Sequence, residues 1–230
     1  MRKTLLIISL VAMITVGGNA QSKDVRLGVK VGPTFDWASS GSTAASSDGM
    51  RLGFNVGLVC DHYFNDHIAF SSGLNVNFLR MKYTFTDRRR IEDFLEEANV
   101  QVSRRLKATN LEIPLKIKLV FDVVDSFDAY VEAGGGLSFN TKDLCKDSYS
   151  FYWVASDGQT YDDCTNQYRL LQASMVFGLG AEYEINGHMG AFVQLVFDHA
   201  FSNVFVRALE KQTGSVLRNN FIGIEAGVMF

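Results

Sequence analysis

The chain has 230 residues, of which 47% are hydrophobic and 20% charged, and its formal net charge at pH 7 is −3. This length suits one domain once an export signal is removed, and the hydrophobic content excludes a disordered chain. The negative net charge argues against a nucleic-acid partner, because phosphate-binding surfaces depend on a basic excess. The 18 Phe, 8 Tyr and 2 Trp suit β-strands or a membrane interface.

The N-terminus has the composition of an export signal. Arg2 and Lys3 precede an apolar run at 5–16, and small residues follow it. That run is too short to cross a hydrocarbon core about 30 Å thick as a helix, which takes about 20 residues. We predict that 1–20 is a signal peptide for Sec-type export and that 21–230 is the mature domain.

Apolar and polar residues alternate along most of the mature chain. In the first such segment, Val29 and Val31 share one face of a strand, and Lys30 points to the other. The alternating segments are 25–37, 51–64, 68–79, 110–119, 127–139, 171–185, 189–201 and 221–230. An even number of strands, eight, is therefore predicted.

The connections between these segments are short and long in strict alternation. Asn186-Gly187 marks one short turn, because Asn-Gly is a hairpin signal. The long connections are 40–49, 80–109, 140–170 and 202–220. We predict an all-β fold: an eight-stranded antiparallel up-and-down transmembrane β-barrel, with four long extracellular loops and short periplasmic turns.

The composition of the two faces decides which one is enclosed. The polar face combines many glycines with a few long charged side chains, which suits a narrow lumen better than a soluble protein's outer coat. The predicted lumen charges are Arg26, Lys30, Arg51, Glu112, Lys116, Lys118, Glu132, Glu182, Asp198 and Glu225. Two roles stay open for them: structural ion pairing and passage of protons or small ions.

The apolar face is predicted to contact outer-membrane lipid. Aromatic residues near its strand ends would form girdles at the membrane interfaces. These residues are Phe35, Trp37, Phe64, Tyr83, Tyr183, Phe201 and Phe230. A terminal aromatic on an alternating strand also predicts recognition of Phe230 by the barrel-assembly machinery.

Four motifs resemble the PorT-like outer-membrane β-barrel family. The strand at 111–118 reads LEIPLKIK, as the fourth strand of that family typically does. Similar matches occur at 27–32, 132–136 and 178–182. The resemblance implies a bacterial outer-membrane location. Some members of the family take part in type IX secretion and gliding, but no residue of this chain assigns it that role.

Three cysteines are spaced for a disulfide rather than for a metal. Cys145 and Cys164 fall in the third long connection, where export would permit a disulfide; two unpaired thiols are the alternative. Closing a loop of about 20 residues would contribute on the order of 3 kcal/mol. Cys60 lies at an even-numbered position of its strand, like the residues predicted to face lipid, so it is predicted to be a small apolar residue on the lipid side. Neither a zinc site nor a cofactor is predicted.

One string, 198–203, resembles the His/Ser site of outer-membrane lipid A deacylases. His199 would be the base and Ser202 the nucleophile. In an unbroken strand these two side chains point to opposite faces, which argues against the site. A lipid-modifying enzyme is therefore an alternative function, and a soluble secreted ligand-binding barrel is another.

Two long connections are candidate contact regions. Residues 90–105 have apolar positions at helical spacing, which predicts an amphipathic helix that packs on the rim or binds a partner. The aromatics of the third connection, Tyr149, Phe151, Tyr152, Trp153 and Tyr161, would form a contact surface or prolong the girdle. The leading hypothesis is a non-enzymatic outer-membrane protein that meets a protein partner at 80–109 and 140–170.

Overall fold

The computed structural model describes residues 25–41, 45–90, 97–151, 154–157, 160–186, 189–206 and 216–230. The predicted signal peptide therefore lies outside the described residues, as do Ile91, Phe94 and Leu95 of the predicted helix and the aromatics Tyr152 and Trp153. No helix within these ranges is long and apolar enough to cross a membrane.

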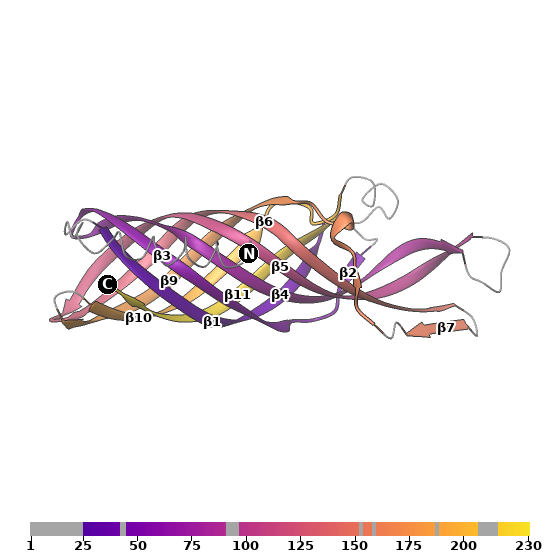
Figure 1. The fold of residues 1–230 in the computed structure, drawn as a ribbon, viewed down its shortest axis with the longest axis horizontal. Coiled ribbons are helices and arrows are strands. Elements are labelled where there is room, and N and C mark those ends of the chain that lie inside the picture. The colour runs from indigo at the N-terminus through magenta and orange to yellow at the C-terminus, as the bar shows by residue number, and fades with distance from the viewer. Residues whose placement is uncertain are drawn as a thin grey trace, which may run out of the picture.

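Eight long strands form the molecule. They are β1 (Val25–Ser40), β3 (Arg51–Asn65), β4 (Ile68–Arg90), β5 (Glu97–Val124), β6 (Phe127–Phe151), β9 (Leu171–Asn186), β10 (Met189–Ala200) and β11 (Leu217–Met229). Each pairs antiparallel with its neighbour in this order, and β11 pairs back onto β1, with Val29 opposite Val228. The sheet is thus a closed eight-stranded up-and-down barrel, as predicted (Figure 1).

The alternation of residues places apolar side chains outside the barrel and polar ones inside. On β1, Val29 and Val31 are 46% and 45% exposed, whereas Lys30 between them is 5% exposed. The same outer face continues on β5 through Leu115, Ile117 and Leu119. The enclosed face carries Lys, Glu, Asp and Asn, which is the reverse of a soluble barrel.

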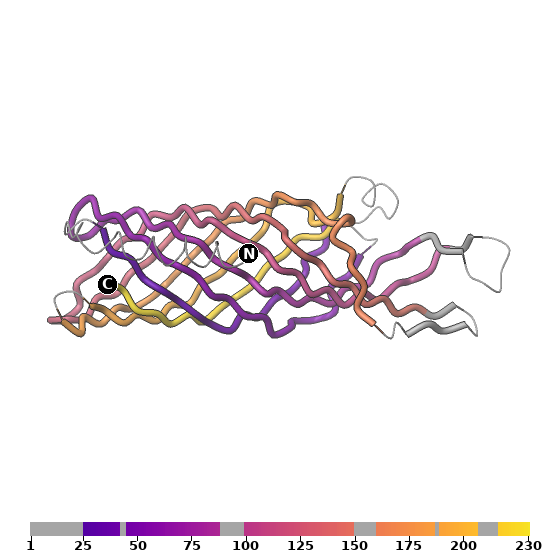
Figure 2. The backbone as a smooth tube through the Cα atoms, in the orientation of Figure 1, coloured from indigo at the N-terminus to yellow at the C-terminus, as the bar shows by residue number. Residues whose placement is uncertain are grey.

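The two ends of the barrel differ. At one end, which we call the turn end, β3 and β4 are joined through Asp66 and His67, and β5 and β6 through Asp125 and Ser126. Ser126 has a φ of 66°, a left-handed conformation found in tight turns. The C-terminus lies at this end, and β4, β5 and β6 run on past the barrel at the other end (Figure 2).

That extension consists of β4 from Leu79, β5 up to Thr109 and β6 from Thr141; we call it the projection. Its β4–β5 ladder continues until Arg90 lies opposite Glu97. Most of the ranges 80–109 and 140–170, predicted as loops, are therefore strand, and the loop prediction is wrong there. At about 3.3 Å per residue, β4 continues on the order of 40 Å past Phe78.

The predicted helix over 90–105 is also wrong, because β5 begins at Glu97. Val100, Val102 and Leu106 are buried on one face of β5, while Gln101 between them is exposed. Both a helical and a two-residue period could be read in this stretch. Pairing with β4 and β6 satisfies the backbone groups of both neighbours, and this selects the strand.

Three short strands of the described chain pair with the projection. At its base, β2 (Ala45–Ser47) pairs with β4 and β8 (Asp162–Asp163) pairs with β6, while β7 (Val154–Asp157) pairs with β6 near the far end (Figure 1). A single 3₁₀ turn, Thr165–Gln167, follows β8.

Candidate functional site

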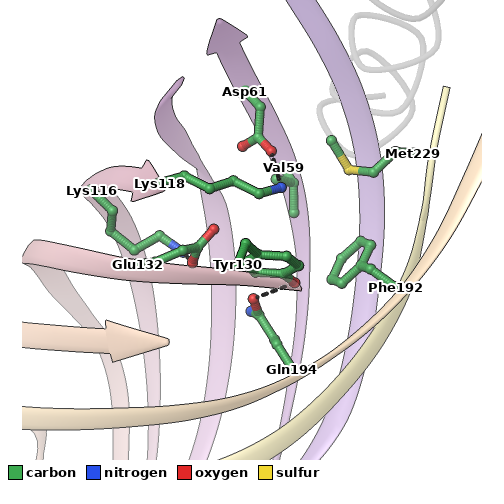
Figure 3. Close-up of a pocket in the computed structure, with 9 residues that line it drawn as sticks. All are labelled: Val59, Asp61, Lys116, Lys118, Tyr130, Glu132, Phe192, Gln194 and Met229. Atoms are coloured by element: carbon green, nitrogen blue, oxygen red, sulfur yellow. Dashed lines mark hydrogen bonds and ion pairs between the residues drawn. The ribbon is translucent and has the colours of Figure 1, made fainter. Parts of the chain in front are cut away.

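A cluster of ion pairs fills the lumen near the turn end. Lys118 Nζ lies 2.8 Å from Asp61 Oδ2 and 3.6 Å from Glu182 Oε2. The same ammonium lies 4.2 Å from the centre of the Tyr130 ring, a cation–π contact (Figure 3). Arg26, at the mouth, pairs with the second oxygen of Glu182 at 2.5 Å. Each buried charge in this layer thus has an opposite charge beside it.

The next layer of the lumen repeats this pairing. Lys30 Nζ is 2.8 Å from Glu225 Oε2, and Lys116 forms an ion pair with Glu132. Gln194 donates to Glu225 and accepts a hydrogen bond of 3.1 Å from the Tyr130 hydroxyl. Since Lys30, Lys116, Glu132 and Glu225 are all at most 5% exposed, they form a buried, cross-linked plug.

Glycines make room for aromatic rings in this plug. A Cβ on Gly180 would lie 2.4 Å from Cζ of Tyr130, and one on Gly227 would lie 2.5 Å from the ring of Phe192. Tyr130, Phe192 and Met229 are at most 7% exposed. The remaining cavity measures about 10 Å³, which is about the space of one water molecule.

Further from the turn end, carboxylates accept hydrogen bonds from amide and hydroxyl groups instead of pairing with cations. Glu112 accepts hydrogen bonds from Asn77 and, at 3.4 Å, from Asn75. Asp198 accepts a hydrogen bond of 2.8 Å from Ser174 Oγ. Both carboxylates line a second cavity of about 20 Å³. Such small cavities do not make a continuous water-filled channel, so the arrangement favours structural pairing over free passage of ions.

The structure places the predicted lumen charges inside the barrel with one exception. Arg51 is exposed, because it is the first residue of β3 and lies at the rim opposite Asp36 of β1. The prediction that Arg51 lies in the lumen is therefore wrong. Arg51 lies at an odd-numbered position, like the enclosed residues of β3, but the strand begins at this residue, outside the enclosed part of the barrel. Sequence reasoning missed Asp61, the partner of Lys118, although Asp61 has the same parity as the enclosed Asn55.

Above the lumen, the base of the projection has an apolar core of its own, which we call the cap core. It includes Tyr83, Phe85, Leu106, Tyr168 and Phe205, all at most 4% exposed. The rings of Tyr83, Phe85 and Tyr168 lie 5.7–6.0 Å from the ring of Phe205. The prediction that Tyr83 belongs to a lipid-facing girdle is therefore wrong, since it points inward.

The cap core includes one buried cation. Arg104 donates to both oxygens of Asp147, at 2.6 and 2.8 Å, and to Gln167 Oε1 at 2.6 Å. Its guanidinium carbon lies 5.0 Å from the centre of the Phe85 ring. Burial alone would lower the pKa of Arg104, but the bonds to Asp147 raise it. This fork–fork contact fixes β5 to β6 at the base of the projection.

A disulfide joins Cys145 of β6 to Cys164, with a Cα–Cα distance of 5.9 Å. The pairing of β5 with β6 shifts its register just before Cys145: Asn110 lies opposite Asn140, but Thr109 lies opposite Lys142. This bulge leaves Thr141 unpaired in the ladder and brings odd-numbered residues of β6 to the inner face. Cys60 is a free, half-buried thiol on the outer side of β3.

Asp143 is a buried carboxylate beside this disulfide. Its backbone binds Thr165 and Cys164, and its side chain accepts a hydrogen bond from Asn140. Burial raises the pKa of Asp143 to about 6, although the Asn140 bond acts in the opposite direction. The carboxyl is therefore a proton acceptor at mildly acidic pH, outside the lipid-facing part of the barrel.

A pH dependence follows from Asp143. A folded-state pKa of about 6, above the usual 3.8, means that the stabilisation is complete below about pH 4 and is lost as the pH rises through 6. The expected loss is on the order of 1–3 kcal/mol. Urea unfolding in detergent micelles at pH 4.5 and 7.5 measures it, and Asp143→Asn should abolish this part of the pH dependence. An unchanged dependence in Asp143→Asn, equal to that of the exposed control Asp162→Asn, would contradict the assignment.

The enzyme-like string does not assemble a base and a nucleophile in one place. The ring of His199 lies on the outer side of β10, between Phe197 and Phe201, with ring centres 6.4 and 6.1 Å away. Ser202 Oγ instead accepts a hydrogen bond of 3.0 Å from the backbone N–H of Ala173. Among the described residues, no group of three or more His, Cys, Asp or Glu side chains is arranged to hold a metal ion.

Comparison with known proteins identifies the family. Residues 19–206 match the model of the family described as outer membrane protein beta-barrel domain, which is more than half of the chain. No curated protein matches the sequence significantly. The finer resemblance to PorT-like proteins and Sec-type export remain predictions from the sequence.

Several solved structures are similar. Neisserial surface protein A, from Neisseria, has 13% identity and a TM-score of 0.40, covering 88% of this chain and 95% of that chain. OprG from Pseudomonas aeruginosa has 11% identity and a TM-score of 0.45, covering 90% and 96%. The outer membrane protease OmpT from Escherichia coli has 7% identity and a TM-score of 0.41, covering 91% and 97%. TM-scores below 0.5 carry no argument about activity, so the assignment depends on the family match. The chain belongs to the outer membrane protein beta-barrel domain family and is a bacterial outer-membrane β-barrel protein.

Proposed function

We propose that the protein is a non-enzymatic surface protein whose projection presents a binding face to a partner outside the cell, and that it is not a pore. Barrels of this class have short periplasmic turns and longer extracellular segments. By that rule the turn end faces the periplasm and the projection faces the exterior.

The observation that carries this proposal is the projection itself. β4, β5 and β6 continue as one sheet beyond the lipid-facing residues, and β6 and β7 remain paired until Phe151 lies opposite Val154. The cap core, the Arg104–Asp147 contact and the disulfide all fix the base of this sheet. A rigid base lowers the entropy lost when the tips meet a partner.

The lumen also supports the proposal that the protein is not a pore. Lys118, Lys116 and Lys30 each pair with a buried carboxylate, and removing any one of them leaves an uncompensated charge. The two lumen cavities described above measure about 10 and 20 Å³, far below the space that a nutrient molecule needs.

The test removes the tips and keeps the base. One variant replaces 87–100 with Asn-Gly, so that Thr86 and Gln101 remain the last pair of the β4–β5 ladder. The other replaces 150–155 with Asn-Gly, so that Tyr149, which packs against the cap core, and Ser156 remain opposite each other. Both variants keep the cap core and should still run as folded barrels on unheated gels.

The readout is complementation of a strain that lacks the gene. Under any condition in which that strain grows less well than the parent, the full chain should restore growth and the doubly shortened chain should not. The full chain should also give no conductance steps in planar bilayers. Full restoration by the shortened chain, or regular conductance steps, would overturn the proposal.

Two other functions lack a supporting observation. A lipid A deacylase needs His199 and Ser202 to be in contact, and their partners are Phe197, Phe201 and Ala173 instead. A role in type IX secretion is implied only by the PorT-like resemblance.

A further inference from the structure

The outer face of the projection carries a cluster of cations just past the lipid-facing residues. It consists of Arg80, Lys82, Arg105, Lys107, Lys142 and Lys146, and we call it the basic patch. Arg80, Arg105 and Lys142 are exposed, and the other three are half-buried. All six positions lie on the base of the projection, below the tips considered above.

The strand register places these cations beside one another. Arg80 lies opposite Lys107 and Lys82 opposite Arg105 in the β4–β5 ladder. Arg105 in turn lies opposite Lys146 on β6. Like charges directly across a ladder destabilise a sheet. Three such pairs in one place therefore need an anion to offset their repulsion.

The chain itself supplies few anions to the patch. Among the described residues, Lys82 pairs with Asp48, which is half exposed, and Lys107 lies 3.9 Å from the ring centre of Tyr161. Asp163 is a further acid nearby: bonds from Thr165 lower its pKa, and Lys142 adds to this effect. Asp36 also lies beside the patch, because its Oδ2 accepts a hydrogen bond of 2.7 Å from the backbone N–H of Arg80, and Asp48 attracts Arg105 as well as Lys82. Neither Arg80 nor Arg105 forms an ion pair within the described ranges.

The position of the patch matches the level of the lipid headgroups. On β4, Arg80 follows the lipid-facing Phe78 by two residues on the same face, a rise of about 7 Å. On β5 the outer face changes from Leu111 through Thr109 to Lys107. The cations thus begin where the hydrocarbon ends, which is where lipid phosphates lie.

The opposite rim provides an internal comparison. Around the turn end, the carboxylates of the described chain that are not fully buried are Asp66, Asp122, Asp125, Asp128 and Glu184, and Arg26 at the mouth is a cation beside them. A general need for solubility does not explain why one rim is basic and the other acidic. A different headgroup chemistry at each membrane surface does explain it.

We infer that the basic patch binds the phosphate groups of lipids in the outer leaflet, with Arg80 and Arg105 as bidentate donors and the lysines as point charges. The ligand class is a phosphorylated glycolipid whose chains pack on the apolar outer face of β4, β5 and β6. This inference is separate from the proposed role of the tips, because the tip-shortened variant keeps all six cations.

The test measures lipid retention by the full chain. Protein in a zwitterionic detergent is mixed with diphosphorylated lipid A, and bound lipid is counted by native mass spectrometry. The triple variant Arg80→Gln/Arg105→Gln/Lys142→Gln should lose at least tenfold in apparent affinity. Arg105→Gln alone should lose about threefold, and the control Arg218→Gln, on β11, should equal wild type. If the triple variant does not fold, the single variant decides the matter.

Two further arms identify the source of the phosphate. Dephosphorylated lipid A should not be retained, and millimolar inorganic phosphate should not displace the phosphorylated lipid, since it lacks the acyl chains. Equal retention of both lipids, or equal binding by Arg105→Gln and Arg218→Gln, would overturn the inference. The tip-shortened chain should bind lipid as wild type does, so this test can fail while the proposed function stands.

Discussion

Lys118→Met is expected to destabilise the folded barrel by about 3–5 kcal/mol, because it leaves a buried carboxylate without its cation. Asp61 is fully buried, one of its oxygens already lacks a partner, and its other oxygen accepts from Lys118. Glu182 retains Arg26, so the loss falls mainly on Asp61. Urea unfolding in micelles, followed by the fraction of heat-modifiable protein, measures the effect.

Two controls separate charge from packing. Lys142→Met removes an exposed lysine and should change the free energy of unfolding by less than about 0.5 kcal/mol. Lys118→Met/Asp61→Asn removes both charges and should recover much of the stability, since a neutral pair of similar volume can replace a buried ion pair. If Lys118→Met unfolds like wild type, the lumen is not the cross-linked plug described above.

Phe205→Ala is expected to cost about 3–5 kcal/mol, confined to the projection. The side chain is 0% exposed and contacts the rings of Tyr83, Phe85 and Tyr168. A cavity there should loosen the base of the projection while the lumen plug keeps the barrel closed. Limited trypsin digestion of the reconstituted protein should therefore cut the projection faster, and the barrel fragment should still migrate as folded.

Phe201→Ala is the matched control for this prediction, because Phe201 is 54% exposed and lies just past the end of β10, in the same connection as Phe205. Its projection should resist trypsin as well as wild type does. If Phe205→Ala unfolded the entire barrel, the projection and the barrel would be one cooperative unit. If neither variant changed the cleavage rate, the cap core would not stabilise the projection.

The barrel itself could be predicted because its signal is local. Alternation such as Val29-Lys30-Val31 fixes which face is enclosed, and glycines opposite long charges indicate a narrow lumen. The turn signal Asn186-Gly187 and the alternation of short and long connections then predict the strand order. None of these steps needs contacts between distant residues.

The projection could not be predicted in the same way because its polarity is inverted. Beyond Phe78 on β4, the inward residues are Leu79, Met81 and Tyr83, and the outward ones are polar. The two-residue period continues, but the apolar side chains now lie on the inner face, as in a water-soluble sheet. A search only for apolar outer faces therefore ended the predicted strand too early. A search for alternation with the apolar residues on either face would have found the projection.

The ion pairs that form across the lumen could not be predicted from the sequence either. Parity places Lys118 and Glu182 on the inner face, but the level at which each lies depends on strand stagger. The bulge at Thr141 likewise changes the parity of β6 partway along, and Cys145 faces inward only because of it. Register shifts of this kind follow from the complete sheet and not from any one segment.

The central claim is that the apolar outer face contacts lipid up to Phe78 and Leu111 and that the projection stands in water beyond. One measurement tests it directly. Fluorescent labels are attached to single cysteines that replace Leu115 or Arg105, two positions on the same face of β5, in a Cys60→Ser background. Quenching of each label by brominated acyl chains and by aqueous iodide is then compared. The Leu115 label should be quenched by the lipid and the Arg105 label by iodide. A Leu115 label shielded from the lipid quencher would contradict the account.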